Sequence, residues 1–138
     1  MRIVLDTNVL ISALLVQKSK PAQLLTAWRR GAFELLTCEP QLAEIREVTR
    51  RPALRALIRP ALAGELVNQL RSMTVWIDGL PPVDRSPDPF DNFLLSMAEG
   101  GQADVLVSGD KRGVLALKSH GTCRIVTVRQ FVLMLKTG

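Results

Sequence analysis

Short apolar runs alternate with helical segments along the whole chain, and this alternation restricts the possible folds more than any other feature. The apolar runs are rich in β-branched residues and have the length of strands, and helical periodicity follows most of them. We predict strands at residues 2–6, 33–37, 75–77, 104–108 and 124–127. This alternation predicts an α/β fold, with a central, mainly parallel β-sheet flanked by α-helices.

Proline, glycine and capping residues mark the ends of the predicted helices. Pro21 suits the first turn of a helix that stops at Gly31. Asp88 is a good N-cap, and Pro89 fits the first position of a helix that runs to about Glu99. We predict helices, the first of them capped by Thr7 or Asn8, at residues 8–15, 21–30, 40–51, 53–58, 60–72, 89–99, 113–117 and 128–136.

The length and composition fit one soluble domain. The chain has no internal repeat, linker or low-complexity segment, so we expect a single domain over residues 1–138. The apolar run from Val9 to Val16 is too short to span a membrane, which predicts a cytoplasmic protein. Cys38 and Cys123 have no C-x-x-C neighbour, and two buried thiols in a reducing compartment are the simpler expectation.

The counts of particular residues exclude several mechanisms. One histidine and no tyrosine exclude paired histidines, a His-rich metal site and a tyrosine nucleophile. The single histidine, His120, lies in a polar stretch, where we expect a surface loop residue rather than a catalyst. The formal net charge of +5 favours a polyanionic partner such as nucleic acid, although ordinary solubility explains so modest a charge more simply.

Acidic residues follow the predicted strands or open the predicted helices. Asp6 ends the first strand, and Asp110 follows the strand at residues 104–108. In parallel α/β folds, ligands bind at the carboxyl ends of the strands, so both acids are expected to face one crevice. Glu44 and Asp91 lie in or near the first turn of helices that often begin at this edge. We therefore predict that Asp6, Glu44, Asp91 and Asp110 converge.

Such convergence predicts a particular chemistry. Carboxylates a few ångströms apart repel one another, and some would be protonated unless a cation neutralises them. Mg²⁺ and Mn²⁺ prefer oxygen ligands and keep several waters, which suits a site of carboxylates without histidine. Such ions activate water and stabilise the charge on a phosphodiester during hydrolysis.

Each acid also has an explanation that needs no ligand. Asp91 occupies the third helical position, where an acid favours the helix dipole, and Glu44 fits an exposed helix face. Asp88 is explained as an N-cap and Asp104 as a strand boundary, so both are secondary candidates for the site. The two acids that directly follow strands are harder to explain, although ordinary turn chemistry would account for either one.

Several sequence blocks occur in the order typical of a known family. They lie at residues 5–12 (LDTNVLIS), 42–48 (LAEIREV), 88–95 (DPFDNFLL), 103–111 (ADVLVSGDK) and 124–131 (RIVTVRQF). Together these blocks resemble the PIN-domain family, and specifically its small bacterial toxin branch of VapC-like ribonucleases. The first and fourth blocks are specific together, and neither is sufficient alone.

The resemblance implies a ribonuclease that cleaves single-stranded RNA with Mg²⁺ or Mn²⁺. It implies that Asp6 ligates the ion directly and that Asp91 and Asp110 bind it directly or through water. It assigns Glu44 to the orientation of a water or a second ion. Asn8 and Ser108 match positions that support the site by hydrogen bonding, with Ser108 in place of the commoner threonine.

The resemblance also implies partners. Members of the toxin branch form homodimers, and a cognate antitoxin often blocks the active site. Gly113 lies where relatives often carry another side chain, so no fifth acid is expected after Asp110. An alternative is a non-catalytic PIN-like module that binds RNA or a protein. Degenerate members of that kind typically lose acids that this chain retains.

Basic and aromatic side chains are candidates for RNA contacts. Lys111 and Arg112 are the best basic candidates because they directly follow Asp110. Arg46 is a further candidate, with Arg50 and Arg51 behind it, and a solvated charged face explains any one of them equally well. Trp28 and Trp76 offer rings for base stacking, although the spacing of Trp28 from Leu24 and Leu25 favours the core or a dimer interface.

Overall fold

The computed structural model describes residues 1–137, so that Gly138, the last residue of the predicted domain, lies outside the described part. Within it, six strands form one sheet in the order β3-β2-β1-β4-β6-β5. Neighbouring strands are parallel, except for the antiparallel pair of β5 and β6. The strands are β1 (Arg2–Leu5), β2 (Glu34–Thr37), β3 (Val75–Trp76), β4 (Val105–Val107), β5 (Ser119–His120) and β6 (Cys123–Val126). The predicted α/β fold with a mainly parallel sheet is confirmed.

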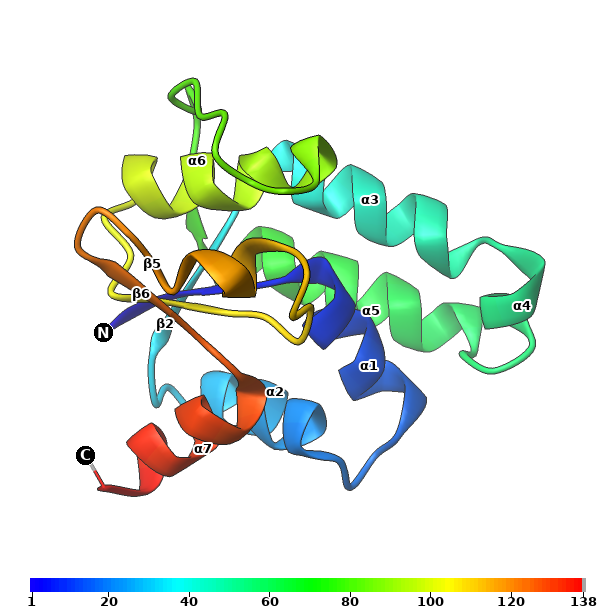
Figure 1. Cartoon of the computed structure of the whole chain (residues 1–138). Coiled ribbons are helices and arrows are strands. Elements are labelled where there is room, and N and C mark those ends of the chain that lie inside the picture. The colour runs from blue at the N-terminus through cyan, green and yellow to red at the C-terminus, as the bar shows by residue number, and fades with distance from the viewer. Residues whose placement is uncertain (138) are drawn as a thin grey trace.

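Helices cover both faces of this sheet (Figure 1). Helix α6 lies on one face, and α2 and α7 lie on the other, with α1, α3 and α5 grouped beyond one end of the strands. The helices are α1 (Thr7–Leu15), α2 (Lys20–Arg29), α3 (Glu39–Thr49), α4 (Pro52–Arg55), α5 (Pro60–Ser72), η1 (Pro89–Asp91), α6 (Asn92–Gly100), η2 (Val114–Leu117) and α7 (Val128–Thr137).

The alternation of side chains along the strands divides the core into two layers. In β1, Ile3 and Leu5 face a cluster that includes residues of α1, α2, α5 and α7. Val4, between them, faces the second cluster, to which α6 contributes most of the helical residues. Successive side chains of a strand point to opposite faces, so apolar runs such as Ile3–Leu5 require cover on both sides. The packing leaves the carboxyl ends of the parallel strands together at one edge.

Local chemistry changes some of the predicted boundaries. Asp6, rather than Thr7 or Asn8, is the N-cap of α1, because its carboxyl accepts a hydrogen bond from the Asn8 N–H. The predicted helix at 53–58 is shorter and covers only Pro52–Arg55. The strand β5 was not predicted, since two residues are too few for a periodic signal, and Gly121 with φ +58° allows the tight turn into β6.

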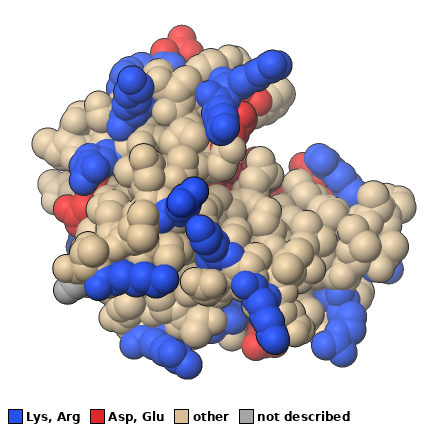
Figure 2. Space-filling view, turned by 60° about the horizontal axis from the view of Figure 1, so that its bottom comes forward, with Lys and Arg blue, Asp and Glu red and all other residues tan. Residues whose placement is uncertain are grey.

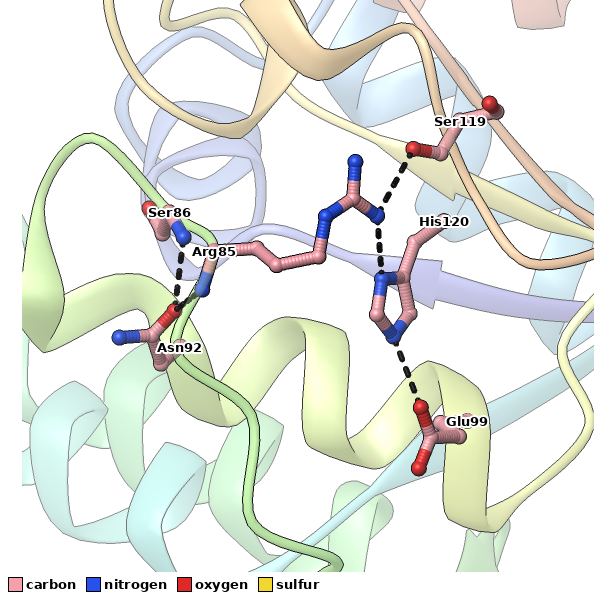
Figure 3. A network of polar contacts seen from close by, with 6 residues as sticks. All are labelled: Arg85, Ser86, Asn92, Glu99, Ser119 and His120. Atoms are coloured by element: carbon pink, nitrogen blue, oxygen red, sulfur yellow. Dashed lines mark hydrogen bonds and ion pairs between the residues drawn. The ribbon is translucent and has the colours of Figure 1, made fainter.

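The prediction of a surface loop at His120 was wrong, because this residue lies in β5 and its side chain is 9% exposed (Figure 3). Arg85 Nη1, which can only donate, lies 2.7 Å from His120 Nδ1. His120 Nε2 therefore carries the proton and donates to Glu99 Oε1 at 3.0 Å. Both ring nitrogens of His120 thus have a polar partner, which offsets the cost of removing the ring from water.

Other expectations about single residues are met. Cys38 and Cys123 are both buried free thiols, as predicted. Trp28 is 3% exposed and belongs to the core, which removes it as a base-stacking candidate. No helix within residues 1–137 is long and apolar enough to cross a membrane.

Candidate active site

Asp6 lies where β1 ends and α1 begins, and it is almost completely buried, with 4% of its surface exposed. Its Oδ2 accepts a hydrogen bond from Ser108 Oγ at 2.8 Å, and its Oδ1 accepts one from Asn8 N at 3.2 Å. Burial raises the pKa of Asp6, the hydrogen bonds from Ser108 and Asn8 oppose this rise, and the charge of Asp110 adds to it. A buried carboxyl with an incomplete set of donors favours a nearby positive charge.

Asp110 stands in the loop that follows β4, beside Asp6. The Ser108 hydroxyl connects the two acids, because it donates to Asp6 and accepts a hydrogen bond from the Asp110 N–H at 3.2 Å. Asp110 Oδ1 accepts a hydrogen bond from Arg112 N at 3.0 Å, which holds the carboxyl in the turn. A Cβ atom on Gly113 would lie only 2.7 Å from Asp110 Oδ2. The glycine therefore provides the space that the Asp110 carboxyl occupies.

Glu44 comes from α3 and lies next to the first turn of α1. Burial raises its pKa, the hydroxyl of Thr7 lowers it, and the charge of Asp6 raises it further. Thr7 Oγ1 is buried and has no hydrogen-bond partner within ordinary distance, although it is near enough to Glu44 to act on its pKa. The Thr7 hydroxyl is therefore a buried polar group close to Glu44 that has no full hydrogen bond within the protein.

The charges of the other acids act on Asp91. Its pKa is raised to about 6, chiefly by burial and then by the charges of Asp6, Asp88, Glu44 and Asp110. Each of these carboxyls must lie near Asp91 to have this effect. We call Asp6, Glu44, Asp88, Asp91 and Asp110 the acidic cluster. The four acids that were predicted to meet thus come from four segments, far apart in the sequence, at one edge of the sheet.

The secondary candidates separate into two groups. Asp88 caps η1 by accepting a hydrogen bond from Phe90 N at 3.1 Å, and its charge also reaches Asp91. Asp104 does not reach the acidic cluster, because it precedes β4 and its Oδ2 accepts a hydrogen bond from Arg2 N at 2.8 Å, where β1 begins. Asp104 therefore lies at the opposite edge of the sheet and bounds the strand.

A buried glutamine that sequence analysis did not identify supports the site. Gln41 Nε2 donates to the Leu5 carbonyl at 2.7 Å, and its Oε1 accepts a hydrogen bond from Thr37 Oγ1 at 2.8 Å. These contacts tie the first turn of α3 to the ends of β1 and β2, and thereby place Glu44 one turn later on the same helix. The position of Gln41 between Pro40 and Leu42, in a helix that packs on the core, was the sequence feature that could have indicated a buried polar role.

Of the basic candidates, Arg46 lies within α3, whereas Arg50 and Arg51 follow its last residue. Arg46 follows Glu44 by two residues, so it points about 200° further around the helix. There it lies 3.8 Å from Glu39 and lines a cavity of about 580 Å³ with Arg50, Arg55 and Arg71. The structure therefore does not bring Arg46 to the acidic cluster.

Arg51 lies nearer to the acids than Arg46 does. Its charge lowers the pKa of Glu44, and its Nη2 lies 3.1 Å from Glu47 Oε1. Lys111 and Arg112 are exposed in the loop directly after Asp110. On the face shown in Figure 2, acidic side chains lie within a hollow between two lobes, and Lys and Arg side chains surround it. Basic side chains around an acidic hollow suit a polyanion that is drawn toward a cation site.

The donor set fits a hard cation that keeps part of its water shell. Within residues 1–137, no group of three or more His, Cys, Asp or Glu side chains is arranged to hold an ion directly. The cluster nevertheless offers carboxylate and hydroxyl oxygens, an unused Thr7 hydroxyl and a negative charge that raises the Asp91 pKa. Mg²⁺ typically binds through one or two carboxylates and several waters, and these residues meet that requirement.

Comparison with known families agrees with this arrangement. The sequence pattern described as the PIN domain matches residues 2–112. The chain belongs to the PIN-domain family. The matched part begins with β1 and ends at Arg112, so it contains the whole acidic cluster. PIN domains are generally metal-dependent nucleases, and membership therefore indicates a nuclease-type hydrolase. No curated protein matches the sequence.

Proposed function

We propose that this PIN domain is an endoribonuclease that cleaves single-stranded RNA with the help of Mg²⁺ or Mn²⁺. The observation that carries the proposal is the Asp91 carboxyl, whose pKa is raised to about 6 by burial and by four neighbouring acids. Such a concentration of negative charge costs stability unless it serves a cation. The surrounding basic side chains and the formal charge of +5 support a nucleic-acid substrate.

We assign different roles to the residues of the acidic cluster according to their positions. Asp6 would ligate the ion directly, Asp91 and Asp110 would bind it directly or through its water shell, and Ser108 would fix the orientation of the Asp6 carboxylate. A bound divalent ion supplies an activated water and stabilises the charge that develops on the phosphodiester. Glu44, beside the Thr7 hydroxyl, would orient the attacking water by accepting a hydrogen bond from it.

The biological role that we propose is the toxin of a type II toxin–antitoxin pair. The sequence blocks that resemble the small toxin branch support this role. A homodimer and a cognate antitoxin that covers the acidic hollow belong to the same proposal. A non-catalytic module that binds RNA or protein is the alternative. It is disfavoured because all four predicted acids are present, and the charges of Asp6, Glu44 and Asp110 raise the pKa of Asp91.

The decisive experiment is cleavage of a mixed pool of single-stranded RNA by the purified protein, with Mn²⁺ or with EDTA. Asp6→Asn is the test variant, and Asp104→Asn is the matched control, because Asp104 lies at the opposite edge of the sheet. We expect cleavage that needs Mn²⁺, survives in Asp104→Asn and falls by at least 100-fold in Asp6→Asn, about 2.7 kcal/mol of barrier. Cleavage by Asp6→Asn at the wild-type rate would refute the assignment of the site.

A folded wild-type protein that cleaves no RNA under either condition would favour the non-catalytic module. Circular dichroism establishes that the protein is folded, and RNA affinity is then the quantity to measure. Binding without cleavage would assign the domain to RNA recognition alone.

A further inference from the structure

The aromatic side chain of Phe90, which is next to the acidic cluster in the sequence, is almost fully exposed to solvent. Phe90 is 82% exposed, which is the largest exposed fraction among the large hydrophobic side chains of residues 1–137. Phe33 and Phe131, by contrast, are buried and pack edge to face in the core. Single exposed apolar residues are common on protein surfaces. Phe90 differs in its position next to acidic residues and in the hydrogen bonds that hold its turn.

Phe90 lies between two members of the acidic cluster in the sequence. It stands in η1 between Asp88 and Asp91, whose carboxyls both belong to that cluster. Its N–H donates to Asp88 Oδ1 at 3.1 Å, and the Asp91 N–H donates to the Asp88 carbonyl at 3.0 Å. Phe90 and Asp91 therefore occupy adjacent positions of one short turn, with Cα atoms about 3.8 Å apart.

The segment that leads to Phe90 is held from two sides (Figure 3). Asn92 Oδ1 accepts hydrogen bonds from the backbone N–H groups of Arg85 at 3.1 Å and Ser86 at 2.8 Å. The Arg85 side chain reaches His120 Nδ1 and the Ser119 carbonyl, and His120 in turn contacts Glu99 on α6. The exposed ring therefore stands on a turn that is anchored before a ligand arrives, which lowers the entropy cost of binding.

We propose that Phe90 is a stacking platform for one nucleobase of the RNA, next to the phosphate that the acidic cluster cleaves. This inference rests on the proposed function, because it takes the substrate to be single-stranded RNA. A single exposed ring on an anchored turn suits the face of an unpaired base, because every base can stack on an aromatic side chain. A protein partner would need a contiguous apolar patch, whereas the sequence neighbours of Phe90 are Pro89 and the acids Asp88 and Asp91 rather than large apolar residues.

Phe90→Ala and Phe90→Trp test the proposal, with Leu57→Ala as the matched control. Leu57 is also highly exposed, at 68%, but it lies after α4 and outside the acidic cluster. Affinity is measured by fluorescence anisotropy in EDTA, so that no cleavage occurs. The two probes are a labelled mixed-sequence single-stranded RNA and a labelled linear polyphosphate, which carries charge without bases.

We expect Phe90→Ala to weaken RNA binding by about 5- to 100-fold and to leave polyphosphate binding unchanged. Phe90→Trp should retain RNA binding, with quenching of the introduced indole when RNA is added, and Leu57→Ala should match the wild type. Equal weakening toward both probes would overturn the proposal, because it would indicate a change in the turn or in the charge distribution. Unchanged RNA binding by Phe90→Ala would overturn it as well.

Two further results separate this inference from the proposed function. If the wild type binds RNA without cleaving it, and Phe90→Ala still loses binding to RNA alone, the stacking role stands and the nuclease assignment fails. If Phe90→Ala instead changes the mass of the protein in sedimentation, the ring is a contact between copies of the chain, and the stacking role is refuted.

Discussion

Replacing Asp91 by asparagine tests the electrostatic interpretation of the acidic cluster without any substrate. The pKa of Asp91 is raised from its usual 3.8 to about 6, by burial and by the charges of Asp6, Asp88, Glu44 and Asp110. Between these two pH values the folded protein binds more protons at this carboxyl than the unfolded chain does. The stability contributed by the protonated form is therefore present below pH 3.8 and is lost as the pH rises through about 6.

The size of the effect follows from the shift. A rise of this extent corresponds to at most about 3 kcal/mol, because one pKa unit is about 1.4 kcal/mol. Asp91 is partly exposed, so screening by water reduces the effect to about 1–2 kcal/mol. We expect Asp91→Asn to raise the free energy of unfolding by that amount at pH 7.5 and to change it little at pH 4. For a chain of this length the melting temperature should rise by about 3–7 °C.

The assay is urea unfolding in EDTA between pH 4 and pH 8, for the wild type, Asp91→Asn and the control Asp104→Asn. Adding Mg²⁺ or Mn²⁺ at pH 7.5 should stabilise the wild type, since the ion binds only the folded state, and should stabilise Asp91→Asn much less. A variant that is no more stable than the wild type at pH 7.5 would refute the inferred repulsion. Equal metal responses in the two proteins would remove Asp91 from the ion site.

Two more substitutions test how the site is supported. Ser108→Ala removes the hydroxyl that donates to the buried Asp6 carboxylate, and we expect it to cost about 1–3 kcal/mol in urea unfolding, with Ser108→Thr close to the wild type. Gly113→Ala places a Cβ 2.7 Å from Asp110 Oδ2, so the Asp110 carboxyl must move. We expect RNA cleavage to fall by about tenfold or more and the melting temperature to change little. The control is Gly64→Ala, because a Cβ at Gly64 meets no atom within 4 Å. Full activity of Gly113→Ala would show that the position of the Asp110 carboxyl is not critical for cleavage.

Much of the fold and of the candidate site was predictable because it depends on local signals. The apolar runs of β1 and β4 must be covered on both faces, and acids that directly follow parallel strands share one edge of the sheet. Asp6 and Asp110 were therefore expected to be neighbours, and Ser108 connects them. The pairing of β5 with β6 was missed, because a strand of two residues has no periodicity and depends on the tight turn at Gly121.

The sequence by itself determined the element types, their parallel arrangement and the edge at which the acids gather, because chain polarity and side-chain alternation are properties of each segment. Tertiary structure alone decided which side chains share a space. Helical phase turns Arg46 away from Glu44, the chain beyond the end of α3 brings the charge of Arg51 within range of Glu44, and Asp104 lies a strand length from Asp110. The raised pKa of Asp91 likewise requires carboxyls from distant segments to lie together, and only packing of the sheet and helices brings that about.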